Sequence, residues 1–272
     1  MHLLTPPHRL GVALALGFML WLPDPAPAQN DAPPVRIETE TPVDAPRSAP
    51  SREAPSLPED RPLHVAFLVV DGVYNTELTA PWDVLEHVTY HVGEGESPGT
   101  RVFAVSPDGQ PVTTAEGLVI VPEFSFAKHP SVDVLVVPSS QGSRDADLEN
   151  VAMVDWVRRV GGEARYVVSL CWGAFVLGEA GLLDGRAATT FPRDYERFAD
   201  AFPDTRLRIH VSFVHDGKVL TSQGGIRSFD VALYLVDRLY GQETAAKIGG
   251  GLLIPWPPDP ETGPEWAVVA AP

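Results

Sequence analysis

The sequence predicts an α/β fold in which a mainly parallel sheet is covered by helices on both faces. Apolar segments rich in β-branched residues alternate with segments of helical periodicity, at the spacing of strand–helix–strand units. These apolar segments, such as 64–70 (HVAFLVV) and 133–137 (DVLVV), are apolar throughout, as strands buried on both faces are. A third apolar segment, 166–170, runs without a loop into a helical segment at Cys171. In such a fold the functional residues are expected at the carboxyl ends of the strands.

The elements are predicted in order from residue 63. Strands are expected over 64–70, 101–106, 133–137 and 166–170, a hairpin of 113–114 with 118–121 around Glu116-Gly117, and a strand pair of 206–214 with 218–222 turning at Asp216-Gly217. Helices are expected over 77–88, 148–160, 173–180, 195–202, 228–240 and 243–252. In the first helix, Pro81 is expected in or near the first turn. In the second, the residues expected to be buried are Val151, Val154, Trp156 and Val157, and Gly161-Gly162 is expected to end the helix.

Composition divides the chain into four segments. In residues 1–28, His8-Arg9 precede the apolar run 10–22, and Ala26-Pro27-Ala28 matches a signal-peptidase site. We therefore expect a cleaved secretory signal and export to the periplasm or the extracellular space, the alternative being an uncleaved membrane anchor. Residues 29–62 read as a disordered proline-rich linker, 63–256 as the folded domain, and 257–272 as a loose tail.

Charge and spacing exclude several function classes. The net charge of −16 argues against nucleic-acid binding, which needs basic patches. After signal cleavage no stable membrane insertion is expected. The sequence contains no phosphate-binding loop, and its histidines lack metal-ligand spacing, so no cofactor and no metal is predicted. Six histidines remain as possible bases, although a surface or structural role is expected for each: His64, His87, His91, His129, His210 and His215.

Cys171 is the only cysteine in the chain, and it stands where the 166–170 strand turns into a helix. A side chain at such a corner is presented at the carboxyl end of the sheet, beside the unpaired N–H groups of the helix that follows. That environment favours the thiolate, which is the nucleophile, and predicts a thiol pKa below the free value of about 8.5. The alternative is a small buried hydrophobic residue, the usual role of a free cysteine.

Four segments give the domain a family resemblance: VAFLVVDGVYNTELTAPWDVL, DVLVVPSSQG, SLCWGAFVLGEAGLLDGRAATT and VLTSQGGIRSFDVALYLVDRLYG. With them, residues 63–256 resemble the ThiJ/PfpI superfamily, which has a class I glutamine amidotransferase-like fold. The chain looks most like the isonitrile hydratase and AraC-regulator-type branch, without a DNA-binding domain. The resemblance implies a flavodoxin-like three-layer sandwich with a cysteine nucleophile elbow.

The resemblance also implies roles for individual residues. Cys171 matches the nucleophile and Glu77 the acidic residue that reaches it. Backbone N–H groups of Ser140 and Trp172 match the donors that would hold an oxyanion. Gly142 and Phe191 are expected to line the same pocket. Because two adjacent negative charges repel, one of Cys171 and Glu77 should hold a proton, and burial is expected to keep Glu77 neutral.

The chain departs from the family pattern at five positions. Ser139-Ser140 replaces a usual Gly-Gly, which should keep the N–H donors and narrow the pocket. Phe191 stands where many relatives have a histidine, so a Cys–His pair is not assumed. Isonitrile hydratases have threonine at the Trp172 position and aspartate at the Glu77 position.

Two classes of function therefore remain open. The first is a cysteine-dependent lyase or hydrolase acting on a small electrophile, either isonitrile hydratase-like or glyoxalase/deglycase-like. The second is a non-catalytic protein that senses oxidants or binds a ligand. A cysteine peptidase or amidase is a weaker alternative, because the expected histidine base is missing. The resemblance also implies a homodimer, for which Phe175, Trp172 and Trp82 could supply buried anchors.

Overall fold

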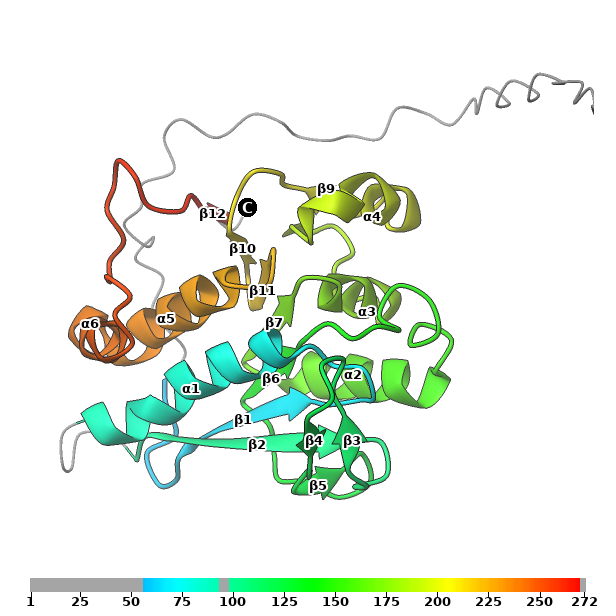
Figure 1. Ribbon diagram of the computed structural model, residues 1–272, viewed down its shortest axis with the longest axis horizontal. Helices are drawn as coiled ribbons and strands as arrows, with labels where there is room; N and C mark the ends of the chain where they lie inside the picture. Colours follow the sequence, from blue (N-terminus) through cyan, green and yellow to red (C-terminus); the bar gives the residue numbers. More distant parts are fainter. Residues whose placement is uncertain (1–55, 93–97, 270–272) are drawn as a thin grey trace, which may run out of the picture. The chain divides into compact units, whose positions relative to one another are not determined.

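The computed structural model describes residues 56–92 and 98–269 (Figure 1). The predicted signal segment 1–28 and most of the predicted linker, residues 29–55, lie outside the described residues. Within the described part of the chain, no helix has both the length and the apolar character needed to cross a membrane.

The main sheet, over the ranges 56–92 and 98–269, has eight strands in the order β12-β10-β11-β7-β6-β1-β2-β5. Their bounds are β1 Leu63–Leu68, β2 Thr100–Ser106, β5 Phe124–Ser125, β6 Val134–Val137, β7 Tyr166–Leu170, β10 Phe213–Asp216, β11 Val219–Ser222 and β12 Ala267–Val269. From β5 to β11 all neighbours are parallel, whereas β10 is antiparallel to β11. The predicted mainly parallel sheet is therefore confirmed.

Helices cover both faces of this sheet (Figure 1). Along β1, Val65 and Phe67 join one core cluster, and Ala66 and Leu68 join the other, because successive side chains of a strand point to opposite faces. The first cluster is completed by α1 (Asn75–His91), α5 (Arg227–Tyr240) and α6 (Gln242–Gly251). The second is completed by α2 (Val151–Glu163), α3 (Gly173–Glu179) and α4 (Tyr195–Ala201). This is the predicted flavodoxin-like three-layer arrangement.

Smaller elements lie outside the main sheet. The predicted hairpin is present as β3 (Val112–Thr113) and β4 (Val119–Ile120). A short parallel pair, β8 (Ala187–Ala188) with β9 (Arg206–Leu207), and a 3₁₀ turn, η1 (Pro192–Asp194), were not predicted. The predicted strand over 206–214 is therefore wrong in part. His210 between β9 and β10 has a left-handed backbone (φ 62°), which ends the extended run.

The α2 helix differs from its predicted bounds at both ends. It begins at Val151 because the Asn150 side chain caps it by accepting the Met153 N–H at 3.2 Å. Val151, predicted to be buried, is therefore at the exposed start of the helix and is 69% exposed. The helix continues through Gly161 instead of ending there. A Cβ on Gly161 would lie 2.7 Å from Leu182 Cδ1, so this glycine permits close packing.

Two further boundaries need correction. Pro81 was expected in or near the first turn, but α1 begins at Asn75 and Pro81 is buried in its second turn. The tail from residue 257 was expected to be loose, but Trp266 stacks on Phe213 and β12 pairs with β10. The packing of this partly buried ring and the burial of Ala267 on the edge of the sheet hold the segment in place.

Candidate active site around Cys171

Cys171 occupies the predicted corner between β7 and α3. Its backbone is left-handed (φ 52°), a conformation that few non-glycine residues adopt outside strained functional turns. The N–H of Cys171 donates to the Ser222 carbonyl at 2.9 Å, and its own carbonyl accepts the Thr190 hydroxyl at 2.9 Å. Hydrogen bonds on both sides of the residue thus fix the corner, and the side chain is 6% exposed.

Glu77 is brought to this corner by the first turn of α1 and is itself buried. Its Oε2 accepts the Ser139 N–H at 3.0 Å and the Ser139 hydroxyl at 2.5 Å. Its Oε1 accepts the Gly225 N–H at 3.2 Å. Three donors on two oxygens match an ionised carboxylate, because each of these hydrogen bonds stabilises the negative charge.

The environment raises the pKa of the Cys171 thiol. Burial is the largest cause, and the negative charge of Glu77 is the next. Ser139 and the Trp172 N–H act in the opposite direction, stabilising the thiolate, without overcoming this increase. The prediction of a lowered pKa is therefore wrong for this structure. Glu77 is stabilised in its charged form, and the α3 helix beside the sulfur has only seven residues.

Ser140 and Gly142 do not have the predicted geometry. The Ser140 N–H, expected to hold an oxyanion, donates to the Ser143 hydroxyl at 2.7 Å. The Ser140 hydroxyl donates to Asp147, and the Gly142 N–H donates to the Ser140 hydroxyl at 3.0 Å. These residues thus close a turn of their own, and the turn uses the Ser140 donor. Of the two predicted oxyanion donors, the Trp172 N–H is the one that acts to lower the pKa of the Cys171 thiol.

Trp172 and Phe191 lie together, as predicted, in a cluster that the sequence did not reveal. Their rings meet edge to face with centroids 6.0 Å apart. The Trp172 indole N–H donates to Asp194 at 2.7 Å. The guanidinium of Arg144 lies over the Trp172 ring at 3.9 Å and also pairs with Asp194 at 2.6 Å. Asp194 therefore binds the tryptophan and the arginine at once.

Tyr74 adds a third aromatic ring to this cluster, with its centroid 5.9 Å from that of Trp172. Burial raises the pKa of the Tyr74 hydroxyl, and the neighbouring Cys171 and Glu77 raise it further. The positive charge of Arg144 acts in the opposite direction on the same hydroxyl. The thiol, the carboxylate and the guanidinium are thus close enough to act on one side chain.

The histidines considered as bases are mostly engaged elsewhere. His64 bonds to the Ser131 carbonyl, His129 to the Trp156 indole and His215 to the Tyr234 hydroxyl. Among residues 56–92 and 98–269, no group of three His, Cys, Asp or Glu side chains could hold a metal ion.

Sequence reasoning placed Ser139 in the pocket but missed its two hydrogen bonds to Glu77, and it missed Gly225, Arg144 and Asp194. The consecutive glycines 224 and 225 offered a signal, because Gly224 has a left-handed backbone (φ 80°) beside the cysteine. A Cβ on Gly224 would lie 2.3 Å from Cys171 Cβ and 2.7 Å from Glu77 Oε1. Arg144 and Asp194 are 50 positions apart, and nothing in their local sequence links them.

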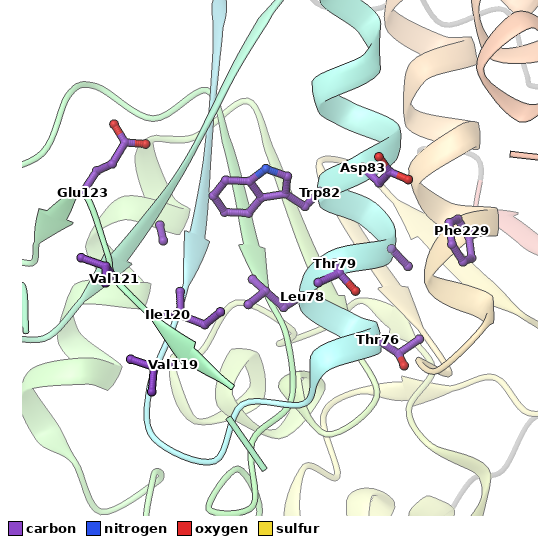
Figure 2. Close-up of a pocket in the computed structure, with 12 residues that line it drawn as sticks. Thr76, Leu78, Thr79, Trp82, Asp83, Val119, Ile120, Val121, Glu123 and Phe229 are labelled. Atoms are coloured by element: carbon purple, nitrogen blue, oxygen red, sulfur yellow. The ribbon is translucent and has the colours of Figure 1, made fainter. Parts of the chain in front are cut away.

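A separate groove of about 670 Å³ runs along α1, away from the cysteine (Figure 2). Trp82 and Leu78 of α1 form one wall, and residues 119–121 form the other. Asp83, Glu123 and Phe229 also line it. This mostly apolar groove was not predicted.

Comparison with known proteins identifies relatives across the folded domain. A sequence profile of the DJ-1/PfpI family matches residues 63–238. An isonitrile hydratase of Pseudomonas putida is 34% identical over 212 residues, which cover 76% of this chain and 87% of the hydratase. The HTH-type transcriptional regulator GbdR of Pseudomonas aeruginosa is 28% identical over 198 residues. Those residues cover 72% of this chain and 52% of the regulator, so the match spans about half the regulator's length.

The fold has a counterpart among solved structures. The crystal structure of a ThiJ/PfpI family protein from Pseudomonas syringae superposes with a TM-score of 0.62. The two chains are 25% identical, and the match covers 80% of this chain and 85% of the other. The sheet order and the helical layers described above are therefore those of an existing fold.

The raised pKa of the Cys171 thiol predicts how its alkylation depends on pH. With burial and the Glu77 carboxylate raising its pKa, Cys171 should react with iodoacetamide at a rate whose pH midpoint lies above the free value of about 8.5. Glu77→Gln removes the negative charge, so the midpoint should fall. The measurement is the alkylation rate against pH by intact mass, with Cys171→Ser as the unlabelled control.

A proton held by Glu77 instead of Cys171 would shift the pH midpoint of alkylation in the opposite direction. If Glu77 were neutral and donated to a thiolate, the wild-type midpoint would lie below about 8.5 and Glu77→Leu would raise it. That pair of results would contradict the assignment of the proton to sulfur.

Proposed function

The chain belongs to the DJ-1/PfpI family, and from this premise we propose that it is a cysteine-dependent enzyme acting on a small electrophilic molecule. The observation that carries the proposal is the buried Glu77 carboxylate held beside the Cys171 thiol by Ser139 and Gly225. A carboxylate in this position can accept the thiol proton as sulfur attacks, and can return it later. The left-handed corner directs the sulfur to the carboxyl end of the sheet, where a substrate carbon would approach.

An isonitrile is the first substrate proposed, by analogy with the Pseudomonas putida hydratase. The Cys171 sulfur bonds to the terminal carbon, and the thiol proton passes through Glu77 to that same carbon, giving a thioimidate. Water then adds to this carbon while its proton goes to nitrogen. The carbon–sulfur bond breaks, the hydroxyl proton returns through Glu77 to sulfur, and an N-substituted formamide leaves. A 1,2-dicarbonyl, the substrate of a glyoxalase-like reaction, is the second candidate.

The other functional classes have less support in the site. Oxidant sensing relies on a thiolate, whereas burial and Glu77 raise the pKa of the Cys171 thiol. A cysteine peptidase is expected to use a histidine as its base, and the position considered for that histidine holds Phe191. A ligand-binding role without turnover remains the competing hypothesis.

Turnover would separate these hypotheses. The wild-type protein should convert cyclohexyl isocyanide to its formamide or methylglyoxal to lactate, and Cys171→Ser should lower the rate by at least about a thousandfold. Chromatography of the products is the measurement, with the exposed Tyr90→Ser as a matched control that keeps activity. Equal rates in Cys171→Ser and wild type, or no conversion of either substrate, would count against the enzyme proposal.

We also propose a homodimer, although not through all the predicted anchors. Phe175 is 1% exposed within the core, and one face of Trp172 is covered by Arg144, so neither offers a free apolar surface. Trp82 lines the groove along α1 (Figure 2). Nearby Val119 and Val121 are 64% and 73% exposed. A second copy of the chain covering this apolar rim would bury these side chains.

Val121→Glu should therefore convert a dimer into a monomer, because it places an unpaired charge in the proposed interface. Light scattering at micromolar concentration gives the mass. Val151→Glu is the control, since Val151 is 69% exposed on α2, on the other layer of the fold, and should leave the dimer intact. A monomeric wild-type mass would refute the dimer.

Export remains a proposal that rests on residues 1–28, outside the described part of the chain. The apolar run and Ala26-Pro27-Ala28 predict cleavage near Ala28, so the mature protein should begin at Gln29. Intact mass of the protein purified from its native host measures this. A mass that includes Met1 would show that the segment is retained.

A further inference from the structure

We propose that Arg144 forms a carboxylate-binding subsite beside Cys171, so that the substrate is a small electrophile carrying a carboxylate group. The inference rests on the cysteine chemistry proposed above and adds a substrate class to it. It begins from the cluster of Arg144, Trp172 and Asp194, none of whose side chains is used by the proton transfer between Cys171 and Glu77.

The position of Arg144 is fixed on two sides. Its guanidinium lies 3.9 Å from the centre of the Trp172 ring, and its Nη1 donates to Asp194 Oδ1 at 2.6 Å. The other oxygen of Asp194 accepts the Trp172 indole N–H at 2.7 Å. Trp172 directly follows Cys171 in the chain, and its backbone N–H acts to lower the pKa of the thiol. The arginine is therefore anchored to the residue next to the nucleophile.

Arg144 has donors that this anchoring leaves unused. A guanidinium has five N–H groups, and Asp194 takes one of them. The Nε of Arg144 is buried and has no hydrogen-bond partner among the described residues. Buried donors are normally satisfied, so this group calls for an acceptor. Arginine binds carboxylates through two parallel N–H groups, and a ligand could reach this guanidinium through the 28% of the side chain that is exposed.

The positive charge of Arg144 also acts to lower the pKa of Tyr74, a tyrosine whose pKa Cys171 raises. Tyr74 packs against Trp172 at 5.9 Å between ring centroids. Both Cys171 and Arg144 influence the charge state of the Tyr74 hydroxyl, in opposite directions. The positive charge of Arg144 is thus felt in the immediate surroundings of the thiol.

The negative groups nearby limit the size of the effect. Glu77 and Asp194 both carry carboxylates, and Asp194 compensates part of the charge of Arg144. The Arg144 side chain is also 28% exposed, so water screens it. We therefore expect a preference for anionic ligands of a few fold, with the carboxylate on the Arg144 side and the electrophilic carbon on the Glu77 side.

A pair of alkylating reagents tests the subsite without knowledge of the substrate. Iodoacetate and iodoacetamide transfer similar groups to a thiol, but the first carries a carboxylate. Cys171 is the only cysteine, so the ratio of the two alkylation rates reports on the charge around it. Arg144→Met should lower the iodoacetate-to-iodoacetamide ratio about threefold to fivefold. Arg144→Lys, which keeps the charge, should stay within about twofold of wild type.

A control variant and a change of salt concentration show whether the ratio of alkylation rates depends on Arg144 itself. Arg159→Met, on the exposed face of α2, removes a positive charge elsewhere and should leave the ratio unchanged. Arg144→Gln gives the same comparison if Arg144→Met fails to fold, and added sodium chloride should bring the wild-type ratio closer to that of the neutral variant.

Other results of these alkylation experiments would contradict the carboxylate-binding subsite or the proposed function. An unchanged ratio in Arg144→Met, or equal slowing of both reagents, would mean that Arg144 only positions Trp172, and would overturn the subsite while leaving the cysteine chemistry standing. Salt that leaves the difference between wild type and the neutral variant unchanged would also overturn it. Failure of both reagents to label folded wild-type protein at any pH would overturn the proposed function itself, and the subsite with it.

Discussion

The left-handed backbone at Cys171 is the constraint on which the rest of the site depends. A non-glycine residue in this region costs about 1–2 kcal/mol, so the surrounding structure must impose it. Hydrogen bonds to Ser222 on one side and from Thr190 on the other hold the corner, and these two residues belong to segments far apart in the chain. The fully buried strand β7 and the buried face of α3 fix the directions of entry and exit.

The proton shared by Cys171 and Glu77 is the second determinant. In such a pair the titration belongs to both groups, and hydrogen bonds decide which atom holds the proton. Ser139 gives both of its donors to Glu77 and also acts to lower the pKa of the Cys171 thiol, so one serine influences both partners. Burial and the charge of Glu77 raise the pKa of the Cys171 thiol, which favours the proton on sulfur, so nucleophilicity would appear when that proton moves.

Much of the fold could be predicted because the signals are local. Strands such as β1 and β7 are apolar throughout, and the corner at Cys171 joins a strand to a helix without a loop. Gly161 was misread because glycine both ends helices and permits close packing, and only the neighbouring Leu182 distinguishes the two uses. The strand at 206–214 was misread because nothing in the composition indicates the left-handed turn at His210.

The site was predictable to a lesser extent. Cys171, Glu77 and Trp172 were found from the corner and from resemblance, whereas the use of the Ser140 N–H depends on a hydroxyl supplied by Ser143. The proton on sulfur could not be anticipated, since it depends on donors from Ser139 and Gly225, which come from two distant loops.

The absence of a side chain at Gly224 has a consequence for how this sequence can change over evolutionary time. A Cβ there would lie 2.3 Å from the Cβ of residue 171, a contact that is the same whether that residue is cysteine, serine or alanine. Loss of the nucleophile therefore does not relax the requirement for glycine. Sequences that drift away from cysteine at 171 would still keep glycine at 224, so the glycine records the shape of the corner and not its chemistry.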